Sequence, residues 1–471
     1  MLTYSLGDRG RLPVYEFLYR SIREDILSGK LRAGEKLPPK RGLAEHLGVS
    51  VMTVENAYAQ LLLEGYLYAE QRRGYYVCAL EQPAKSRPPQ PVPRSTPSPE
   101  QEERAWFADL KTNYTPQGQF PFSVWAKLMR EVLTERDRSL LKPMPGRGLL
   151  TLRKAIAGYL DSFRGMTVLP EQIVIGAGTE FLYSLLVQLL GRERRFAVED
   201  PGYARISQVY RANGADCVAV PLDGQGLSVE GLRRQGAEIA HLSPNHHFPT
   251  GAVTPAFRRR ELLSWAEESP SRYLIEDDYD SEFRFSGKPV PTVQSIDRAG
   301  KVIYINTFSK TLTPAIRISY LVLPPALSRR FTEQLGFISC TVPSFEQLTL
   351  AKFISGGYFE SHLARTRHFY RRQRDAMIRA IRESPLGGRC GIREADAGLH
   401  FLLETDSPYS DTELTRRAAT LGVQVSCLSQ YYLHREDAPS GCLVINYSGV
   451  EEAVMGEAAR RLAQAAFGAK A

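Results

Sequence analysis

Apolar positions along the first part of the chain predict three helices. Between residues 14 and 28 they recur at helical spacing, and Gly29 ends that pattern. A second, short helix is expected before Gly48, and Ser50 is placed to cap a third. The inward positions of the three helices are Val14, Phe17, Leu18, Ile22 and Ile26, then Leu43, Ala44 and Leu47, then Val54, Ala57, Tyr58 and Leu61.

Two strand-like runs follow these helices, at residues 66–69 and 75–78, and the basic turn 71–74 joins them. Three helices and a hairpin with a basic tip predict an α+β winged helix-turn-helix over residues 1–80. A small protein-interaction domain with the same helices is the alternative. In the DNA-binding interpretation, the third helix offers side chains to the major groove, and basic residues meet the phosphate backbone. The candidate DNA-binding residues are Lys40, Arg41, Ser50, Val51, Met52, Thr53, Glu55, Asn56, Arg72, Arg73 and Gly74.

Residues 81–104 contain seven prolines and almost no apolar side chains. Such a composition cannot nucleate a core and favours a semi-extended spacer. The sequence therefore predicts two independently folded bodies, with the second spanning residues 105–471.

Strand-like and helix-like runs alternate in this second segment. The strand-like runs are 196–198, 217–220, 239–243, 273–275, 302–305 and 318–323. This alternation predicts a three-layer α/β fold, with a mainly parallel sheet between helices. Ligands of such sheets lie at the carboxyl ends of the strands, so the polar residues there are the candidates for chemistry.

The run from Lys301 to Ile305 ends in hydroxyl residues, a lysine and, further on, an arginine. Lys310 at such a strand end can form a Schiff base with an aldehyde cofactor. Thr307, Ser309 and Arg317 can hold a phosphate beside it. A surface lysine in a loop is the alternative interpretation of this stretch taken alone.

Other predicted strand ends supply the remaining parts of a pyridoxal phosphate site. Backbone N–H groups near Gly178, with the Thr179 hydroxyl, can cradle a phosphate. Asp277 can pair with a pyridinium N–H, with Asp278 as the second choice, and Tyr279 can hydrogen-bond the ring oxygen. Tyr203 can stack on the ring, Arg205 can meet a carboxylate, and His246 and His247 are further polar candidates. No metal site is predicted, because no carboxylate or cysteine accompanies the histidines at ligand spacing.

Composition adds few constraints. The chain has 471 residues, 43% of them hydrophobic, and a formal net charge of +8, which permits an anionic partner without requiring one. The six cysteines are scattered without a CxxC pair, which fits a reducing cytosol. The most apolar run, residues 181–190, is too short to span a bilayer, so we expect no membrane segment and a cytoplasmic location.

Residues 12–78 resemble the GntR-type winged helix, and the chain from about residue 110 resembles the fold-type I, class I aminotransferases. Together they resemble the MocR/GabR-type transcriptional regulators, notably in EDDYDSEF, NTFSKTLTPAIRISY and SPNHHFPTG. The resemblance implies a smaller C-terminal subdomain, pyridoxal phosphate on Lys310, a head-to-tail homodimer and an operator with two half-sites. It also implies an amine or amino-acid effector that forms an external aldimine and thereby tunes transcription.

Two departures from the aminotransferases concern the effector. Phe248 stands where they usually have asparagine, which leaves His246 and His247 as candidate replacements. The strand 443–447 has no arginine, so Arg205 or a basic residue near 430–435 would have to bind a carboxylate. An active aminotransferase with an appended DNA-binding domain and a regulator that senses pyridoxal phosphate itself therefore remain alternatives.

Overall fold

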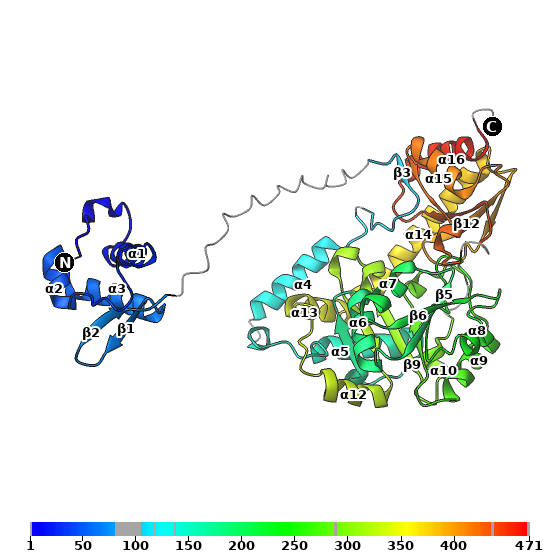
Figure 1. The fold of residues 1–471 in the computed structure, drawn as a ribbon. Helices are drawn as coiled ribbons and strands as arrows, with labels where there is room; N and C mark the ends of the chain where they lie inside the picture. The colour runs from blue at the N-terminus through cyan, green and yellow to red at the C-terminus, as the bar shows by residue number, and fades with distance from the viewer. Residues whose placement is uncertain are drawn as a thin grey trace. The chain divides into compact units, whose positions relative to one another are not determined.

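The computed structural model describes residues 2–80, 105–116, 118–135, 138–286, 290–434 and 438–468 (Figure 1). The chain divides into two compact units, residues 1–103 and 104–471. The predicted proline-rich spacer, residues 81–104, lies outside the described residues. Each unit is described by itself.

The first unit is a winged helix-turn-helix, as predicted. Its regular elements are α1 (Val14–Leu27), α2 (Lys40–Leu47), α3 (Val51–Leu63), β1 (Leu67–Glu70) and β2 (Gly74–Val77), after the 3-10 turn η1 (Leu6–Arg9). Leu18, Ile22, Leu43, Val54 and Leu61 are fully buried in one core, because each lies on the inward face of its helix.

The ends of α2 and α3 follow from local chemistry. Gly48 ends α2 in the left-handed region, at φ 65°, where a residue with a Cβ is disfavoured. Two residues later the Ser50 hydroxyl accepts a hydrogen bond from the Thr53 N–H at 3.1 Å and caps α3. The turn between the helices is therefore built from glycine and a capping serine.

The second unit is built on a seven-stranded sheet with the order β4-β10-β9-β8-β7-β5-β6. Strand β10 runs antiparallel to both of its neighbours, and the other pairs are parallel. The strands are β4 (Ile173–Gly176), β5 (Arg195–Asp200), β6 (Asp216–Pro221), β7 (Ile239–Leu242), β8 (Tyr273–Asp277), β9 (Val302–Thr307) and β10 (Ser319–Val322).

Helices cover both faces of this sheet, which gives the predicted three layers (Figure 1). Adjacent residues Val174 and Ile175 of β4 belong to different apolar clusters, because successive side chains of a strand point to opposite faces. The surrounding helices are α4 (Phe122–Glu135), α5 (Leu150–Arg164), α6 (Thr179–Leu190), α7 (Ala204–Ala212), α8 (Val229–Arg234), α9 (Ala256–Glu267), α10 (Val293–Ile296), α12 (Pro325–Leu335) and α13 (Ser344–Ser355). Burial on both faces explains why these strands are continuous apolar runs rather than alternating ones.

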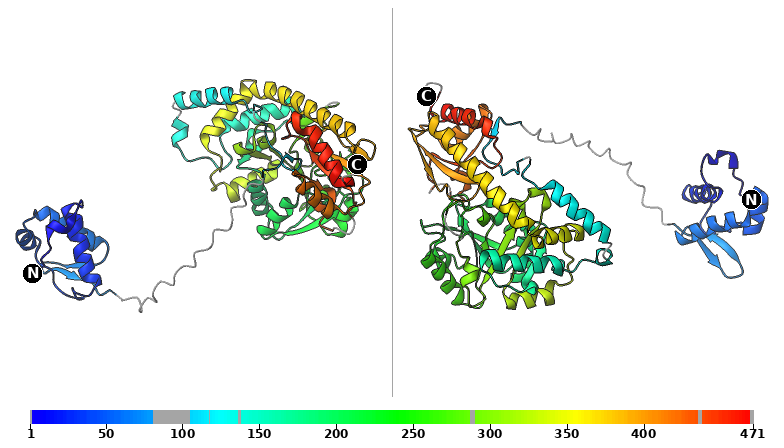
Figure 2. Two further views of the ribbon diagram at one scale, coloured as in Figure 1. Left: turned by 90° about the horizontal axis from the view of Figure 1, so that it is seen from above. Right: turned by 180° about the vertical axis from the view of Figure 1, so that it is seen from behind.

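A smaller C-terminal subdomain follows, as expected. It holds the antiparallel sheet β11-β12-β15-β14 and the short parallel pair β13-β3. Figure 2 shows α14 extending from the helices of the large sheet to this subdomain. Its elements are β3 (Ala108–Asp109), α14 (Tyr358–Glu383), β11 (Cys390–Arg393), β12 (His400–Thr405), α15 (Asp411–Thr420), β13 (Val423–Gln424), β14 (Ser426–Cys427), β15 (Cys442–Asn446) and α16 (Glu452–Phe467). Across the described residues, none of the helices has both the length and the apolar character needed to cross a membrane.

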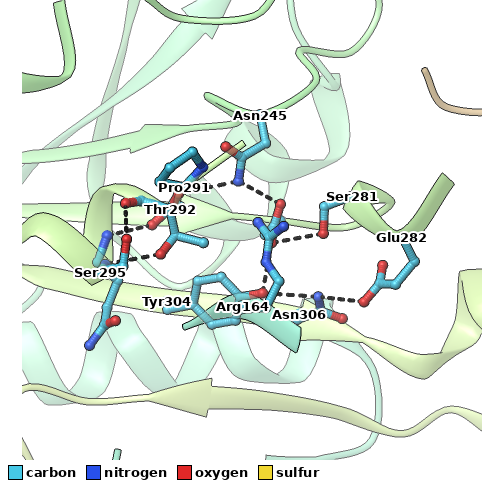
Figure 3. Close-up of polar contacts among 12 residues, drawn as sticks. Arg164, Asn245, Ser281, Glu282, Pro291, Thr292, Ser295, Tyr304 and Asn306 are labelled. Carbon is cyan, nitrogen blue, oxygen red and sulfur yellow. Dashed lines mark hydrogen bonds and ion pairs between the residues drawn. The ribbon is translucent and has the colours of Figure 1, made fainter. Parts of the chain in front are cut away.

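A buried polar network joins α5 to the ends of β8 and β9 (Figure 3). Arg164 donates to Asp278 Oδ2 at 2.6 Å, and the two side chains are only 2% and 1% exposed. Tyr304 and Ser281 also donate to Oδ2, at 2.7 and 2.9 Å, and Asn245 donates to Oδ1 at 2.7 Å. The Asp278 carboxylate is thus compensated on both oxygens.

Replacing Arg164 should destabilise the second unit strongly. The substitution Arg164→Leu leaves the Asp278 carboxylate buried without its cation, and we expect the free energy of unfolding to fall by about 3–5 kcal/mol. Urea unfolding followed by tryptophan fluorescence measures this loss, because Trp106, Trp125 and Trp265, the three tryptophans of the chain, all lie in that unit.

The matched control is Arg195→Leu, which removes an exposed ion pair with Asp216. Its cost should stay below about 1 kcal/mol. Equal effects of the two substitutions would contradict the structural role given to Arg164.

Candidate functional site

A cavity of about 540 Å³ lies at the carboxyl ends of the strands, between the large sheet and the C-terminal subdomain. Side chains from several distant segments of the chain line it. They include nine of the residues singled out in the sequence, namely Thr179, Tyr203, Arg205, Asp277, Tyr279, Thr307, Ser309, Lys310 and Arg317. The parallel strands bring these segments together, because their carboxyl ends meet at one edge of the sheet.

Lys310 lies in the four-residue helix α11 (Phe308–Thr311), directly after β9. Thr307 begins that turn, since its hydroxyl accepts a hydrogen bond from the Ser309 N–H at 3.1 Å. Burial lowers the pKa of Lys310, although Asp280 and Asp277 act in the opposite direction. A lowered pKa increases the fraction of neutral amine, which is the form that attacks an aldehyde.

Asp277 ends β8 and is buried, and its two oxygens differ. Oδ2 accepts a hydrogen bond from the Tyr183 hydroxyl at 2.5 Å and lies 3.3 Å from His241 Nε2. Oδ1 is buried and has no hydrogen-bond partner among the described residues. An unpaired buried carboxylate oxygen beside a cavity fits a ligand that presents an N–H group.

The contact between His241 and the Tyr210 hydroxyl indicates which ring nitrogen of His241 carries the proton. The Tyr210 hydroxyl lies 2.6 Å from His241 Nδ1 and has no other acceptor within the described residues, so we assign it as the donor. The remaining ring proton is then on Nε2, and it points to Asp277. Tyr183 and His241 therefore both donate to the same oxygen of Asp277.

Asp278, the second choice for this role, does not line the cavity. Both of its oxygens are already bonded in the Arg164 network, so it has no free acceptor to offer. The adjacent carboxylates Asp277 and Asp278 differ because one points into the cavity and the other back toward α5.

His246 and His247 are not among the residues that line the cavity. His246 Nδ1 lies 2.8 Å from Asp280 Oδ2 and 3.2 Å from the Tyr279 hydroxyl, so this histidine lies behind Tyr279. His247 Nδ1 lies 2.8 Å from the Thr250 hydroxyl. Burial lowers the pKa of His247 to about 3, so its imidazole is neutral near neutral pH.

Phe248 does line the cavity, with its ring edge-on to Tyr203 and Tyr431 and 5.2 Å from the ring of His400. Where the aminotransferases place an asparagine, this chain therefore presents an aromatic wall. The Phe248 ring is apolar and cannot itself replace the amide hydrogen bond.

Several lining residues were not anticipated. They include Glu180, Tyr183, Glu199, His241, His400 and Tyr431. A histidine inside the otherwise apolar run 239–242 was a local signal for His241. For Tyr183 the sequence signal was weaker: this residue follows Thr179 by four positions and therefore lies on the same face of the helix. For His400 and Tyr431, in the C-terminal subdomain, no local sequence signal indicated a place in the cavity.

The end of the cavity near β4 suits an anion. Gly178, at φ 90°, has no side chain, and a Cβ there would overlap the Arg317 guanidinium. The Ser309 hydroxyl is buried without a hydrogen-bond partner among the described residues. Arg317 itself has a positive φ of 49° and donates to Glu180 Oε2 at 2.7 Å. Glycine, hydroxyl and guanidinium are together the groups that bind a phosphate well.

In the winged helix, the predicted DNA-facing residues divide into two groups. Val51, Met52, Asn56, Arg41, Arg72 and Arg73 are exposed, as contact with DNA requires. Lys40 and Glu55 instead form an ion pair at 2.7 Å, and the Thr53 hydroxyl lies 2.8 Å from that of Ser50. Gly74 has a φ of 123° and lies beside Lys36, so its role in the wing is to allow a backbone conformation that other residues rarely adopt.

Comparisons with known proteins agree with both units. The description "Bacterial regulatory proteins, gntR family" matches residues 14–77, and "Aminotransferase class I and II" matches residues 108–462. The uncharacterized HTH-type transcriptional regulator YdeL of Bacillus subtilis (strain 168) is 36% identical over 452 residues, 96% of each chain. The probable rhizopine catabolism regulatory protein MocR of Rhizobium meliloti is 32% identical over 466 residues, 96% of this chain and 94% of that one.

Among solved structures, the kynurenine aminotransferase of Pyrococcus horikoshii has a TM-score of 0.68 and 26% identity. The match covers 77% of this chain and 91% of that chain.

Fold and site together define a class, the regulators in which a DNA-binding winged helix precedes an aminotransferase domain. The chain belongs to the MocR-type transcriptional regulators of the GntR family, whose second domain is an aminotransferase class I and II domain. The aminotransferase fold implies pyridoxal phosphate as the cofactor, and the GntR domain implies DNA binding.

A side chain at Gly178 should weaken phosphate binding. In Gly178→Ala the new Cβ displaces the Arg317 guanidinium, so we expect the affinity for pyridoxal phosphate to fall about tenfold or more. Absorbance titration of the apo-protein measures this. Gly158→Ala is the control, because Gly158 lies in α5 with open space around it, and it should leave the affinity unchanged.

Proposed function

We propose that this transcriptional regulator holds pyridoxal phosphate on Lys310 and that an amine or amino-acid effector at the same site changes its DNA binding. The observation that carries the proposal is the unpaired, buried Asp277 Oδ1, which faces the cavity that Lys310 lines. Together they offer an acceptor for a ring N–H and an amine for an aldehyde.

The chain supplies a group for each part of the cofactor. Asp277 would accept a hydrogen bond from the ring nitrogen, and Tyr203 and Tyr279, which line the same cavity, would contact the ring and its oxygen. The groups that would hold the phosphate are Gly178, Thr179, Thr307, Ser309 and Arg317. When bound, pyridoxal phosphate supplies an electrophilic carbon that reacts with amines and a ring that withdraws electrons.

The charges of the cavity favour an effector with both an amine and an acidic group. Its cationic lining residues, within the described chain, are Lys111, Arg205, Lys310 and Arg317. Arg205 is the candidate for the effector carboxylate, because β15 carries no arginine. An effector amine that replaced Lys310 as the partner of the cofactor would leave the Lys310 amine free to take up a proton, which would change the charge of the cavity. Regulation needs no further chemistry, so we expect binding without efficient turnover.

A homodimer, arranged head-to-tail, is part of the proposal. Large apolar side chains are exposed at three places, namely Phe122 of α4 at 69%, Leu141 of the 3-10 turn η2 (Arg138–Leu141) at 88%, and Phe337 just after α12 at 83%. Exposed apolar groups of this size are typical of subunit contacts. A dimer would read two half-sites in fixed register, and an effector that binds its two arrangements with affinities differing by a few kcal/mol shifts their populations.

The covalent attachment can be tested directly. Borohydride reduction of the holo-protein should place the cofactor on the peptide that contains Lys310, with an absorbance band that Lys310→Ala abolishes. Arg317→Ala is the comparison variant, in which the band should persist but require more cofactor. A band and a label that survive in Lys310→Ala would reject the assignment.

The class of function can be separated in two assays. Operator binding is measured without cofactor, with cofactor, and with cofactor plus candidate amines, and we expect it to change when the amine is added. A change produced by the cofactor alone would indicate a sensor of pyridoxal phosphate. Turnover of an amino donor and a keto acid at about 1–1000 per second, without operator binding, would indicate an enzyme.

Contacts between the wing and DNA phosphates should show in the salt dependence. The double variant Arg72→Ala, Arg73→Ala should weaken binding to specific and random duplexes alike and reduce the salt slope by about 2. Fluorescence anisotropy at several salt concentrations gives the slope. Arg195→Ala, an exposed arginine of the other unit, should leave it unchanged. An unaltered slope in the double variant would remove these arginines from the interface.

A further inference from the structure

The Glu180 carboxylate joins two arginines at the anion-binding end of the cavity. Its Oε2 accepts a hydrogen bond from Arg317 Nη2 at 2.7 Å, and its Oε1 accepts one from Arg205 Nη1 at 3.3 Å. The three residues come from the start of α6, the start of α7 and the segment after η5 (Pro314–Ile316). All three line the cavity that holds Lys310.

Glu180 is ionised near neutral pH. Burial acts to raise its pKa, but hydrogen bonds and charge from Arg317, together with a hydrogen bond from Arg205, lower it below its ordinary value. Each of its oxygens is directed to a different guanidinium, so one negative charge is shared by two cations. These are the groups that the proposed function assigns to the cofactor phosphate and the effector carboxylate.

From this geometry we propose that Glu180 is an internal competitor for anionic ligands. The Glu180 carboxylate pairs with Arg317 until a phosphate replaces it. It also pairs with Arg205 until an acidic group of the effector replaces it there. Glu180 therefore weakens the binding of phosphate-bearing ligands and keeps the cofactor exchangeable. This inference rests on the proposed cofactor site, since it concerns the affinity of that site.

Two physical effects of Glu180 lower the affinity of the cavity for a phosphate. A phosphate must replace the Glu180 carboxylate as the partner of Arg317, which costs the interaction already present. Once bound, the phosphate also lies close to the Glu180 charge, and like charges at such a separation repel. Both effects depend on negative charge on the ligand, so an aldehyde without a phosphate should not experience them.

The test compares three ligands on the wild-type apo-protein and Glu180→Gln. Absorbance titration with pyridoxal phosphate should show about twofold to fivefold tighter binding to the variant, because an amide keeps the size of the carboxylate without its charge. Titration with pyridoxal, which lacks the phosphate, should give the same affinity for both proteins. Inorganic phosphate, measured by the rise in melting temperature, should bind the variant more tightly by a similar factor.

Glu230→Gln is the matched control. Glu230 also lies in the first turn of a helix and pairs with an arginine of the same helix, but it does not line the cavity. It should alter none of the three affinities. Equal tightening in Glu230→Gln would mean that net charge alone is responsible and would overturn the inference.

Two other results also overturn it. Unchanged or weaker binding of pyridoxal phosphate by Glu180→Gln would mean that Glu180 only positions Arg317. A parallel gain for pyridoxal would mean that the effect does not concern the phosphate. Failure of the wild-type protein to bind either aldehyde would instead refute the proposed cofactor site, while the inorganic phosphate measurement would still decide the role of Glu180.

Discussion

Two neighbouring carboxylates, Asp277 and Asp278, meet at the buried end of β8, and the second unit depends on how each is compensated. A buried carboxylate without partners takes up a proton or destabilises the fold. Asp278 receives Arg164 and three further donors, which makes it part of the framework between α5 and the sheet. Asp277 receives its donors on one oxygen and leaves the other facing the cavity. The end of β8 therefore contributes both to the stability of the fold, through Asp278, and to the cavity, through Asp277.

The cavity has two ends with different relations to the aminotransferases. At the cofactor end, the lysine, the carboxylate, the glycine cradle and the arginine are all present at the strand ends. At the other end, which we propose for the effector, Phe248 presents an aromatic ring and β15 lacks an arginine. This difference between the two ends fits the proposed function, in which the cofactor serves ligand recognition rather than turnover. The identity of the relatives as transcriptional regulators agrees with this division.

The winged helix needs nothing from the second unit to bury its core. Its three helices and hairpin enclose their own apolar residues, and its DNA-facing candidates lie on α3, at the start of α2 and in the turn between β1 and β2. Within this unit the Lys40–Glu55 ion pair shows that a basic residue near the recognition helix can be engaged by the protein itself. The position of a basic residue in the sequence therefore does not show whether it contacts a DNA phosphate or forms an ion pair within the protein.

The sequence by itself determined the two folds, because helical and strand periodicity are local properties that each segment carries. It also determined the composition of the site at the strand ends, since glycine, hydroxyl, carboxylate and lysine residues directly follow apolar runs. Only the tertiary structure decided which carboxylate of the pair Asp277–Asp278 faces the cavity, and that His246 and His247 lie behind its wall. It alone placed Tyr183 and His241 on Asp277, and Glu180 between Arg205 and Arg317. These contacts join segments far apart in the chain, and their geometry follows from the order and twist of the strands rather than from any local pattern.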